Sequence, residues 1–120
     1  MGSFDGKVAL ITGAGSGIGR ATALLLAQRG ASIIGFDIDG SGLADAVGEA
    51  QVNGGMMTAV VGDVSSRDDC HTAVAETVAE YGRLDLLANI AGVASSQHLT
   101  NLGQDDWDHL VGVNLSGVVW

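Results

Sequence analysis

Short apolar runs alternate along the chain with longer stretches in which apolar residues recur at helical spacing. The short runs are apolar on both faces, which is typical of strands buried in a parallel sheet. The pattern predicts strands over 8–12, 31–36, 56–61 and 84–89. It predicts helices over 18–28 and 40–53, a third from a cap at Ser65 or Ser66 to 81, and a last one over 104–120. Four successive strand–helix units favour an α/β fold with right-handed crossovers.

The predicted helices each carry small or apolar residues at the spacing of one helix face. Gly30 stands where a left-handed residue would end the first helix. The expected buried faces are Ala21, Leu24, Leu25 and Gln28 in the first helix, Leu43, Ala46, Val47 and Ala50 in the second, and Cys70, Ala73, Val74, Thr77, Val78 and Tyr81 in the third. The polar stretch 90–103 is long for a connection, so it is a candidate functional loop.

Length and composition bound the possibilities further. With 120 residues, 47% of them hydrophobic, the chain is expected to form one domain over 1–120 and not to be disordered. A net charge of −9 disfavours nucleic acid and anionic membrane surfaces as partners. The single cysteine, Cys70, fits a reducing compartment, and no signal peptide or membrane-spanning stretch is recognisable. We therefore expect a cytoplasmic protein without a membrane partner.

A glycine-rich segment, Thr12-Gly-Ala-Gly-Ser-Gly-Ile-Gly19, lies between the first predicted strand and helix. Such a turn lets the backbone approach a pyrophosphate, and the helix N-terminus behind it offers free N–H groups. It is not a P-loop, because Arg20 follows Gly19 where a lysine is needed. The spacing G-x-G-x-x-G also fails, and the pattern that fits is T-G-x-x-x-G-x-G. A tight turn without a ligand is the alternative interpretation.

Further motifs follow in order along the chain. They are Asp63-Val64 after the third strand, Asn89-Ile-Ala-Gly92 after the fourth, Trp107-Asp108, and Val113-Asn-Leu-Ser-Gly-Val118 in the last helix. Together with the glycine turn, they make the chain resemble the short-chain dehydrogenase/reductase family over its whole length. Ile90 departs from the family pattern, which has a second asparagine at that position.

The resemblance implies a set of cofactor-binding residues and one catalytic residue. The implied cofactor-binding residues are Gly13, Ser16, Gly17, Ile18, Gly19, Asp37, Asp63, Val64, Asn89, Ala91 and Gly92. Asn114 matches the asparagine of the family's proton relay. Asp63 could equally be an ordinary capping acid, and Asn89 could serve to tie strand and loop backbone together.

The expected cofactor is NAD rather than NADP. Asp37 ends the second strand 18 residues after Gly19, where an acid hydrogen-bonds the adenosine ribose and repels a 2′-phosphate. The positions at which the family commonly places a base for NADP hold Ser16 and Ile38. Asp39 lies two residues further on and is expected to cap the loop or the next helix.

The rest of the family's catalytic set is not found. A tyrosine with a lysine four positions later supplies acid–base chemistry in the family, and a serine orients the carbonyl oxygen. The one tyrosine, Tyr81, is followed at the fourth position by Asp85 and is expected in the core, and the one lysine, Lys7, precedes the first strand. The histidines and the cysteine show no metal-ligand spacing, so no metal site is expected.

The resemblance implies a Rossmann-like, doubly wound parallel sheet, truncated after four strands in the order 3-2-1-4. We expect the NAD-binding N-terminal half of an oxidoreductase that transfers hydride between the cofactor and a small alcohol or carbonyl substrate. The alternatives are a non-catalytic nucleotide-binding module and a mini-Rossmann scaffold. The complete protein is expected to be a homo-oligomer, and its substrate cannot be inferred from these residues.

Overall fold

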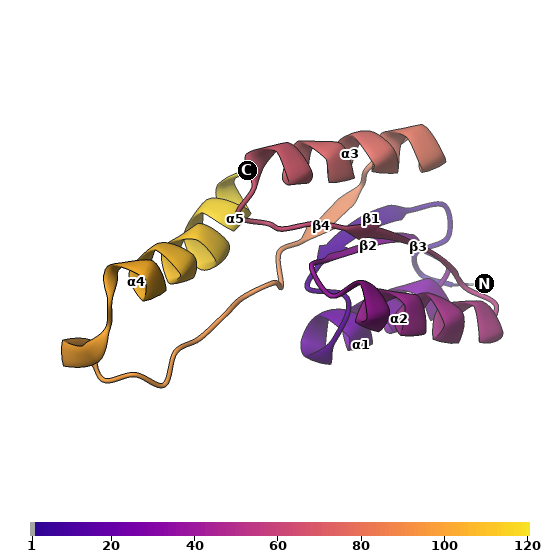
Figure 1. Cartoon of the computed structure of the whole chain (residues 1–120). Helices are drawn as coiled ribbons and strands as arrows, with labels where there is room; N and C mark the ends of the chain where they lie inside the picture. The colour runs from indigo at the N-terminus through magenta and orange to yellow at the C-terminus, as the bar shows by residue number, and fades with distance from the viewer. Residues whose placement is uncertain (1) are drawn as a thin grey trace.

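Four parallel strands form the centre of the protein, whose residues 2–120 are described by a computed structural model (Figure 1). The strands are β1 (Val8–Thr12), β2 (Ser32–Asp37), β3 (Met56–Val61) and β4 (Leu86–Ala88). Each neighbouring pair is parallel, and the order across the sheet is β3-β2-β1-β4. The predicted α/β fold, Rossmann-like with strand order 3-2-1-4, is therefore confirmed.

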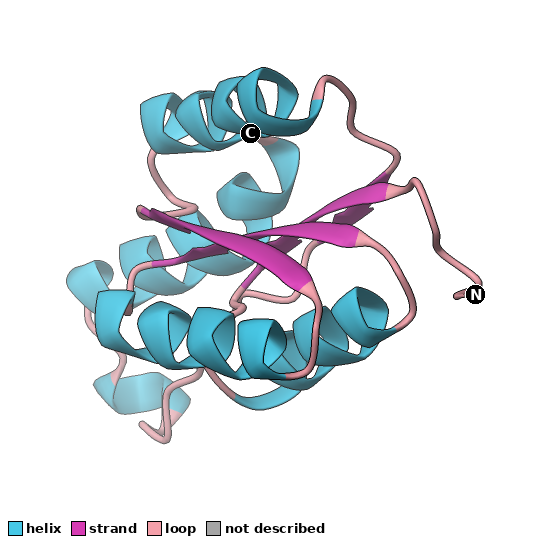
Figure 2. Cartoon of the chain, turned by 90° about the vertical axis from the view of Figure 1, so that its right-hand side faces the viewer, coloured by secondary structure: helices cyan, strands magenta, loops and turns pink. Residues whose placement is uncertain are grey.

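Helices cover both faces of the sheet (Figure 2). The helical segments are α1 (Gly17–Gln28), α2 (Gly40–Val52), α3 (Arg67–Tyr81), the 3₁₀ turn η1 (Leu99–Asn101), α4 (Gln104–Val111), the π-helical turn η2 (Gly112–Ser116) and α5 (Gly117–Val119). Figure 1 shows α1 and α2 together on one side and α3 on the other, while α4 extends away from the sheet. Within residues 2–120, no helix is long and apolar enough to cross a membrane.

Two apolar clusters separated by the sheet hold these layers together. Because side chains alternate across a strand, Ala9 and Ile11 of β1 point to one face and Leu10 points to the other. The first face packs on α1 and α2, and the second packs on α3 and Val113. The strands are therefore buried on both sides, as their continuous apolar sequences predict.

Of the predicted buried face of α1, only Leu24 packs against the core, and Ala21, Leu25 and Gln28 are exposed. Gly19, Ala23 and Ala27 are the buried residues of this helix, whereas Leu25 is 47% exposed. The cause is close packing, because a side chain at Gly19 would overlap the carbonyl of Gly13. Apolar size therefore misleads here, since only small residues let this helix approach the glycine turn.

The predicted stripe of α3 is only partly correct. Cys70, Ala73 and Thr77 are buried, but Val74 and Val78 are 40% and 48% exposed. A helix that packs on a sheet through a narrow line of small residues leaves flanking positions in solvent. The cap is now assigned, since the Ser66 hydroxyl accepts a hydrogen bond from the Asp69 N–H at 3.2 Å.

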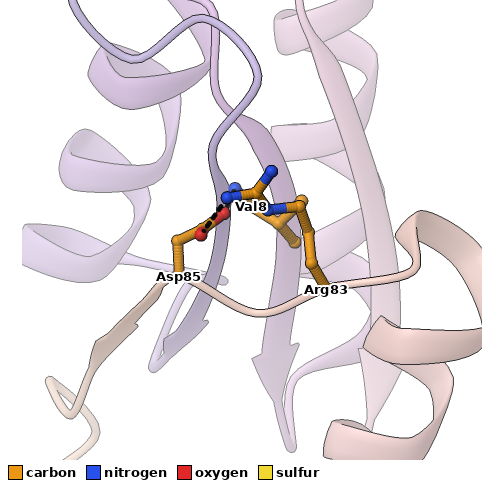
Figure 3. Close-up of polar contacts among 3 residues, drawn as sticks. All are labelled: Val8, Arg83 and Asp85. Atoms are coloured by element: carbon orange, nitrogen blue, oxygen red, sulfur yellow. Dashed lines mark hydrogen bonds and ion pairs between the residues drawn. The ribbon is translucent and has the colours of Figure 1, made fainter.

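Strand β4 is shorter than predicted, and just before it one backbone acceptor for β1 is replaced by the side chain of Asp85. The Asp85 N–H donates to the Val8 carbonyl, and the Val8 N–H donates to Asp85 Oδ2, both at 2.9 Å. The Arg83 guanidinium donates to Asp85 Oδ1 at 2.6 Å (Figure 3). The contact with Arg83, supported by the Val8 N–H, holds the pKa of Asp85 below its usual value.

The predicted last helix is confirmed, with one change in its winding. The chain stays helical from Gln104 to Val119, but η2 widens it to a π turn around Asn114. Within this turn the amide of Asn114 makes two hydrogen bonds to the backbone of Val93. Single π turns of this kind often occur at functional positions.

Replacing Asp85 should destabilise the chain in a pH-dependent way. Asp85→Ala should lower Tm more than Asp85→Asn, because asparagine keeps an oxygen for the Val8 N–H but loses the charge facing Arg83. The native pKa is depressed, so the ionic contribution is complete above the unfolded-state pKa of about 4 and is lost as pH falls through the native pKa. The difference in Tm between wild type and Asp85→Asn should therefore shrink at acid pH.

Thermal unfolding followed by circular dichroism between pH 7 and pH 2 tests this expectation. Asp45→Asn is the matched control, because it removes the same charge from an exposed position on α2. A constant difference in Tm across the pH range would contradict the assigned role of Asp85.

Candidate cofactor site

A cavity of about 360 Å³ opens where the carboxyl ends of the four strands meet. The loops that follow β1, β2, β3 and β4 each contribute to its wall, and α4 covers one side. Of the eleven predicted cofactor-binding residues, ten line it: Gly13, Ser16, Gly17, Ile18, Gly19, Asp37, Asp63, Val64, Ala91 and Gly92. Ligands of open α/β sheets bind in this position, next to the strands at which the order reverses.

The glycine turn brings backbone close to backbone at the floor of the cavity. Gly13 has a φ of +70°, and a side chain there would come within 2.9 Å of the Ala91 backbone. Gly17 has a φ of +54° at the start of α1 and faces open space. Ser16 precedes the helix without making a side-chain cap, so the first-turn N–H groups remain available. This arrangement suits an anionic diphosphate.

Asp37 shapes the turn as well as carrying charge. Its Oδ2 accepts a hydrogen bond from the Gly15 N–H at 2.8 Å, and its Oδ1 accepts one from the Asp39 N–H at 3.0 Å. Asp39 itself caps α2, as expected, by accepting from the Gly42 N–H at 3.0 Å. That bond, together with the Ser41 hydroxyl, lowers the pKa of Asp39. The two acids therefore act differently, since only Asp37 lines the cavity.

Asp63 is held at the end of β3 by its neighbours. Its Oδ1 accepts hydrogen bonds from the Ser65 N–H at 2.8 Å and the Ser65 hydroxyl at 2.7 Å. Its own N–H donates to Asp69 Oδ2 at 2.9 Å. Asp63 thus holds the turn before α3, while its Oδ2 makes no hydrogen bond within residues 2–120. Both interpretations of this acid, structural and ligand-binding, fit the geometry.

The loop after β4 is tied to the glycine turn by Thr12. The Thr12 hydroxyl accepts from the Ile90 N–H at 3.0 Å and from the Ala91 N–H at 3.1 Å. It also donates to the Ala88 carbonyl at 3.5 Å. Asn89, the eleventh predicted residue, is exposed and does not line the cavity. The structure thus assigns to Thr12 the tie between strand and loop that the sequence offered to Asn89.

Asn114 does not line the cavity, and it connects the π turn η2 to a residue that does, Val93. Its Oδ1 accepts from the Val93 N–H, and its Nδ2 donates to the Val93 carbonyl, both at 2.8 Å. Both polar groups of this amide are therefore engaged with one residue of the loop that lines the cavity. The geometry makes Asn114 a positioning residue for that loop.

Nothing in the described residues points to a metal or to a reactive thiol at this site. Residues 2–120 hold no group of three or more His, Cys, Asp or Glu side chains that could bind a metal ion. Cys70 is buried and donates its S–H to the Val64 carbonyl at 3.2 Å. Burial, with the nearby Asp69 and Asp63 charges, raises the pKa of this thiol.

Comparison with known proteins agrees with the resemblance found in the sequence. The family model described as short chain dehydrogenase matches residues 7–120. The chain belongs to the short-chain dehydrogenase/reductase family.

Individual relatives show the same relationship. The chain is 45% identical over 115 residues to the 3-oxoacyl-[acyl-carrier-protein] reductase FabG of Thermotoga maritima, which covers 96% of this chain and 47% of that protein. A short-chain dehydrogenase/reductase from Burkholderia phymatum, solved in complex with NAD, superposes with a TM-score of 0.94 at 38% identity and covers 99% of this chain and 42% of the other. A short chain dehydrogenase from Mycobacterium paratuberculosis bound to NAD superposes with a TM-score of 0.93 at 32% identity. The match covers 98% of this chain and 48% of the other. The chain spans about half the length of the relatives that it matches.

Several residues that line the cavity were not identified from the dehydrogenase motifs. They are Phe36, Ile38, Gly62, Ile90, Val93, His109 and Val113. Ile90 lies inside a motif, and Phe36, Ile38, Gly62 and Val93 each lie next to a predicted site residue, so widening the predicted set by one residue would have found these five. Val113 lies next to the predicted catalytic residue Asn114, and it was named as part of a motif but not as a site residue. His109 follows the Trp107-Asp108 motif, which contributes no residue to the predicted site.

Removing the Thr12 hydroxyl should destabilise this short-chain dehydrogenase/reductase chain. Thr12→Val keeps the shape of the side chain but leaves two backbone N–H groups of the β4 loop without their acceptor. We expect the free energy of unfolding to fall by about 2 kcal/mol. Thr12→Ser, which loses only a methyl group, should cost about 1 kcal/mol. Urea denaturation of the three proteins measures both values, and equal losses would contradict the role given to the hydroxyl.

Proposed function

We propose that this chain is the NAD-binding half of a short-chain dehydrogenase/reductase that interconverts alcohols and carbonyl compounds. The observation that carries this proposal is the cavity at the strand ends, in which the glycine turn, Asp37 and Asp63 lie together. NAD, when bound, supplies the nicotinamide carbon that accepts or donates a hydride. The residues of this chain would bind and orient the dinucleotide.

The residues present fit a dinucleotide diphosphate and two ribose–base ends. Gly17 leaves open space at the start of α1, next to first-turn N–H groups that would receive the diphosphate. Asp37 lies at the end of β2, where its carboxylate would accept hydrogen bonds from ribose hydroxyls. Asp63 and Val64 would bind the adenine, and Ala91 and Gly92 would lie along the middle of the cofactor.

The preference for NAD over NADP follows from charge at the ribose end. Asp37 places a carboxylate where NADP would bring a phosphate, and Ile38 beside it offers no base. Arg20 is the first cation after the glycine turn, and its guanidinium donates to Glu49 Oε2 at 2.7 Å. Arg20 does not line the cavity, so it is not placed to receive a 2′-phosphate.

Asp37→Asn should weaken the binding of NAD and narrow its advantage over NADP by about tenfold, because repulsion of the 2′-phosphate is lost. Asp39→Asn is the matched control, since it removes the same charge two residues away, where the carboxylate caps α2 outside the cavity. Isothermal titration calorimetry of the wild type and of both variants with each cofactor gives the six affinities. Equal or tighter binding of NADP by the unmodified chain would refute the proposed preference, and no binding of NAD at all would refute the proposed function.

Acid–base catalysis is proposed to reside outside these 120 residues. Tyr81 is the last residue of α3 and packs on the core, and its hydroxyl lies 3.1 Å from Thr58 Oγ1 on β3. Lys7 precedes β1 and lies at the opposite edge of the sheet from the cavity. The two groups are therefore not placed to act as the family's tyrosine–lysine pair. In the whole enzyme we assign Asn114 to the proton relay and expect assembly as a homo-oligomer.

The 120-residue chain should bind NAD without measurable turnover. The loss of positioned acid–base groups alone lowers rates by about 10²–10⁴-fold, and the loss of substrate orientation lowers them further. NADH formation with a panel of secondary alcohols, followed by absorbance, should stay at the rate without protein. A rate proportional to chain concentration and abolished by Asn114→Ala would place the chemistry within these residues after all.

A further inference from the structure

His109 lines the cavity although none of the family motifs in this chain includes it. It lies on α4, one helical turn before Val113, which also lines the cavity. The His109 side chain makes no hydrogen bond or ion pair within residues 2–120. Its imidazole is therefore exposed at the rim without a structural partner to explain it.

Contacts of the neighbouring turn show which end of the cavity His109 faces. Val113 belongs to the same apolar cluster as Val64, and a side chain at Gly112 would lie 3.4 Å from the Ser65 Cβ. This face of the helix thus packs against the turn that follows β3. Asn114 turns the other way, towards Val93 and the loop after β4. His109 accordingly stands on the side of the cavity that Asp63 and Val64 form.

The chemistry at this end suits a flat base that carries an amino group. Val64 and Val113 supply apolar walls, and Asp63 keeps Oδ2 free to accept a hydrogen bond. An imidazole adds a planar surface, and aromatic side chains bind bases by stacking on them. A favourable interaction with the helix dipole does not explain His109 either. That interaction needs a helix C-terminus, and here the helix continues into η2.

We propose that His109 is a cofactor-contact residue that covers the outer side of the adenine ring of the dinucleotide. This inference rests on the proposed function and goes beyond it, because it names a residue for one end of the ligand. The nicotinamide end would be bound without a contribution from His109.

Imidazole NMR signals test the contact directly, because the chain has only three histidines. His71 is exposed on α3, His98 is exposed in the loop before η1, and neither lines the cavity. Addition of AMP should shift the imidazole signal of His109, which is assigned by its loss in His109→Ala, and leave the other two in place. Nicotinamide mononucleotide should leave all three in place. Movement of the His109 signal by nicotinamide mononucleotide instead of AMP would overturn the proposal.

Affinities provide the second measurement. His109→Ala should weaken the binding of AMP and NAD about fivefold or more, while His109→Phe, which keeps a planar ring, should stay within about twofold of wild type. His98→Ala is the matched control and should bind like wild type, with circular dichroism verifying the fold of each variant. If wild type binds NAD and AMP but His109→Ala binds them equally well, the proposal for His109 fails alone. If wild type binds neither, the proposed function fails and the role of His109 fails with it.

Discussion

The hydroxyl of Thr12 is the contact on which the cofactor cavity depends. It lies at the end of the central strand β1 and accepts two backbone N–H groups from the loop that follows β4. The glycine turn begins at the next residue, and Gly13 packs against the same loop closely enough to exclude a side chain. Two segments separated by 78 residues in sequence are thereby fixed at one edge of the sheet. A buried hydroxyl can do this because each N–H would otherwise lose its hydrogen bond on leaving water.

Acidic side chains organise the other loops at this edge in a similar way. Asp37 binds the N–H groups of Gly15 and Asp39, Asp39 binds that of Gly42, and Asp63 binds that of Ser65. The acids that give the chain much of its negative charge here are thus hydrogen-bonded to backbone donors. An anionic ligand is still accommodated, because the N–H groups at the start of α1 are not used by these carboxylates. Charge and loop shape come from the same residues, so the acids that we propose to select the ligand also build the loops around the cavity.

The elements of this fold were predictable because apolar runs, glycines and caps all indicated the same structure. Strand order and the placement of ten site residues at one cavity followed from the motifs and the rule for open α/β sheets. The buried face of α1 was not predictable from apolar size, since packing against the glycine turn demands small residues such as Gly19 and Ala23. The short length of β4 was not predictable either, and next to its ends the side chains of Asp85 and Thr12 accept hydrogen bonds from backbone N–H groups. Such contacts involve distant residues and leave no periodic signal in the sequence.

The topology of the sheet explains why all the loops around the cavity belong to this half of the dehydrogenase fold. Chain order runs outward from β1 to β2 and β3 on one side, and β4 returns to the other side of β1. The crevice created by this reversal lies between loops that all belong to residues 2–120. Helix α4 and η2 then close one side, where Val113 joins the apolar cluster that includes Val64 while Asn114 binds Val93. The π turn therefore contacts two parts of the cavity wall. Asn114 binds the loop after β4, and Val113 packs on the side of the turn after β3. The cavity is consequently a property of the local topology of these residues. The chemistry that we propose would also need a tyrosine–lysine pair, which the residues lining the cavity do not include.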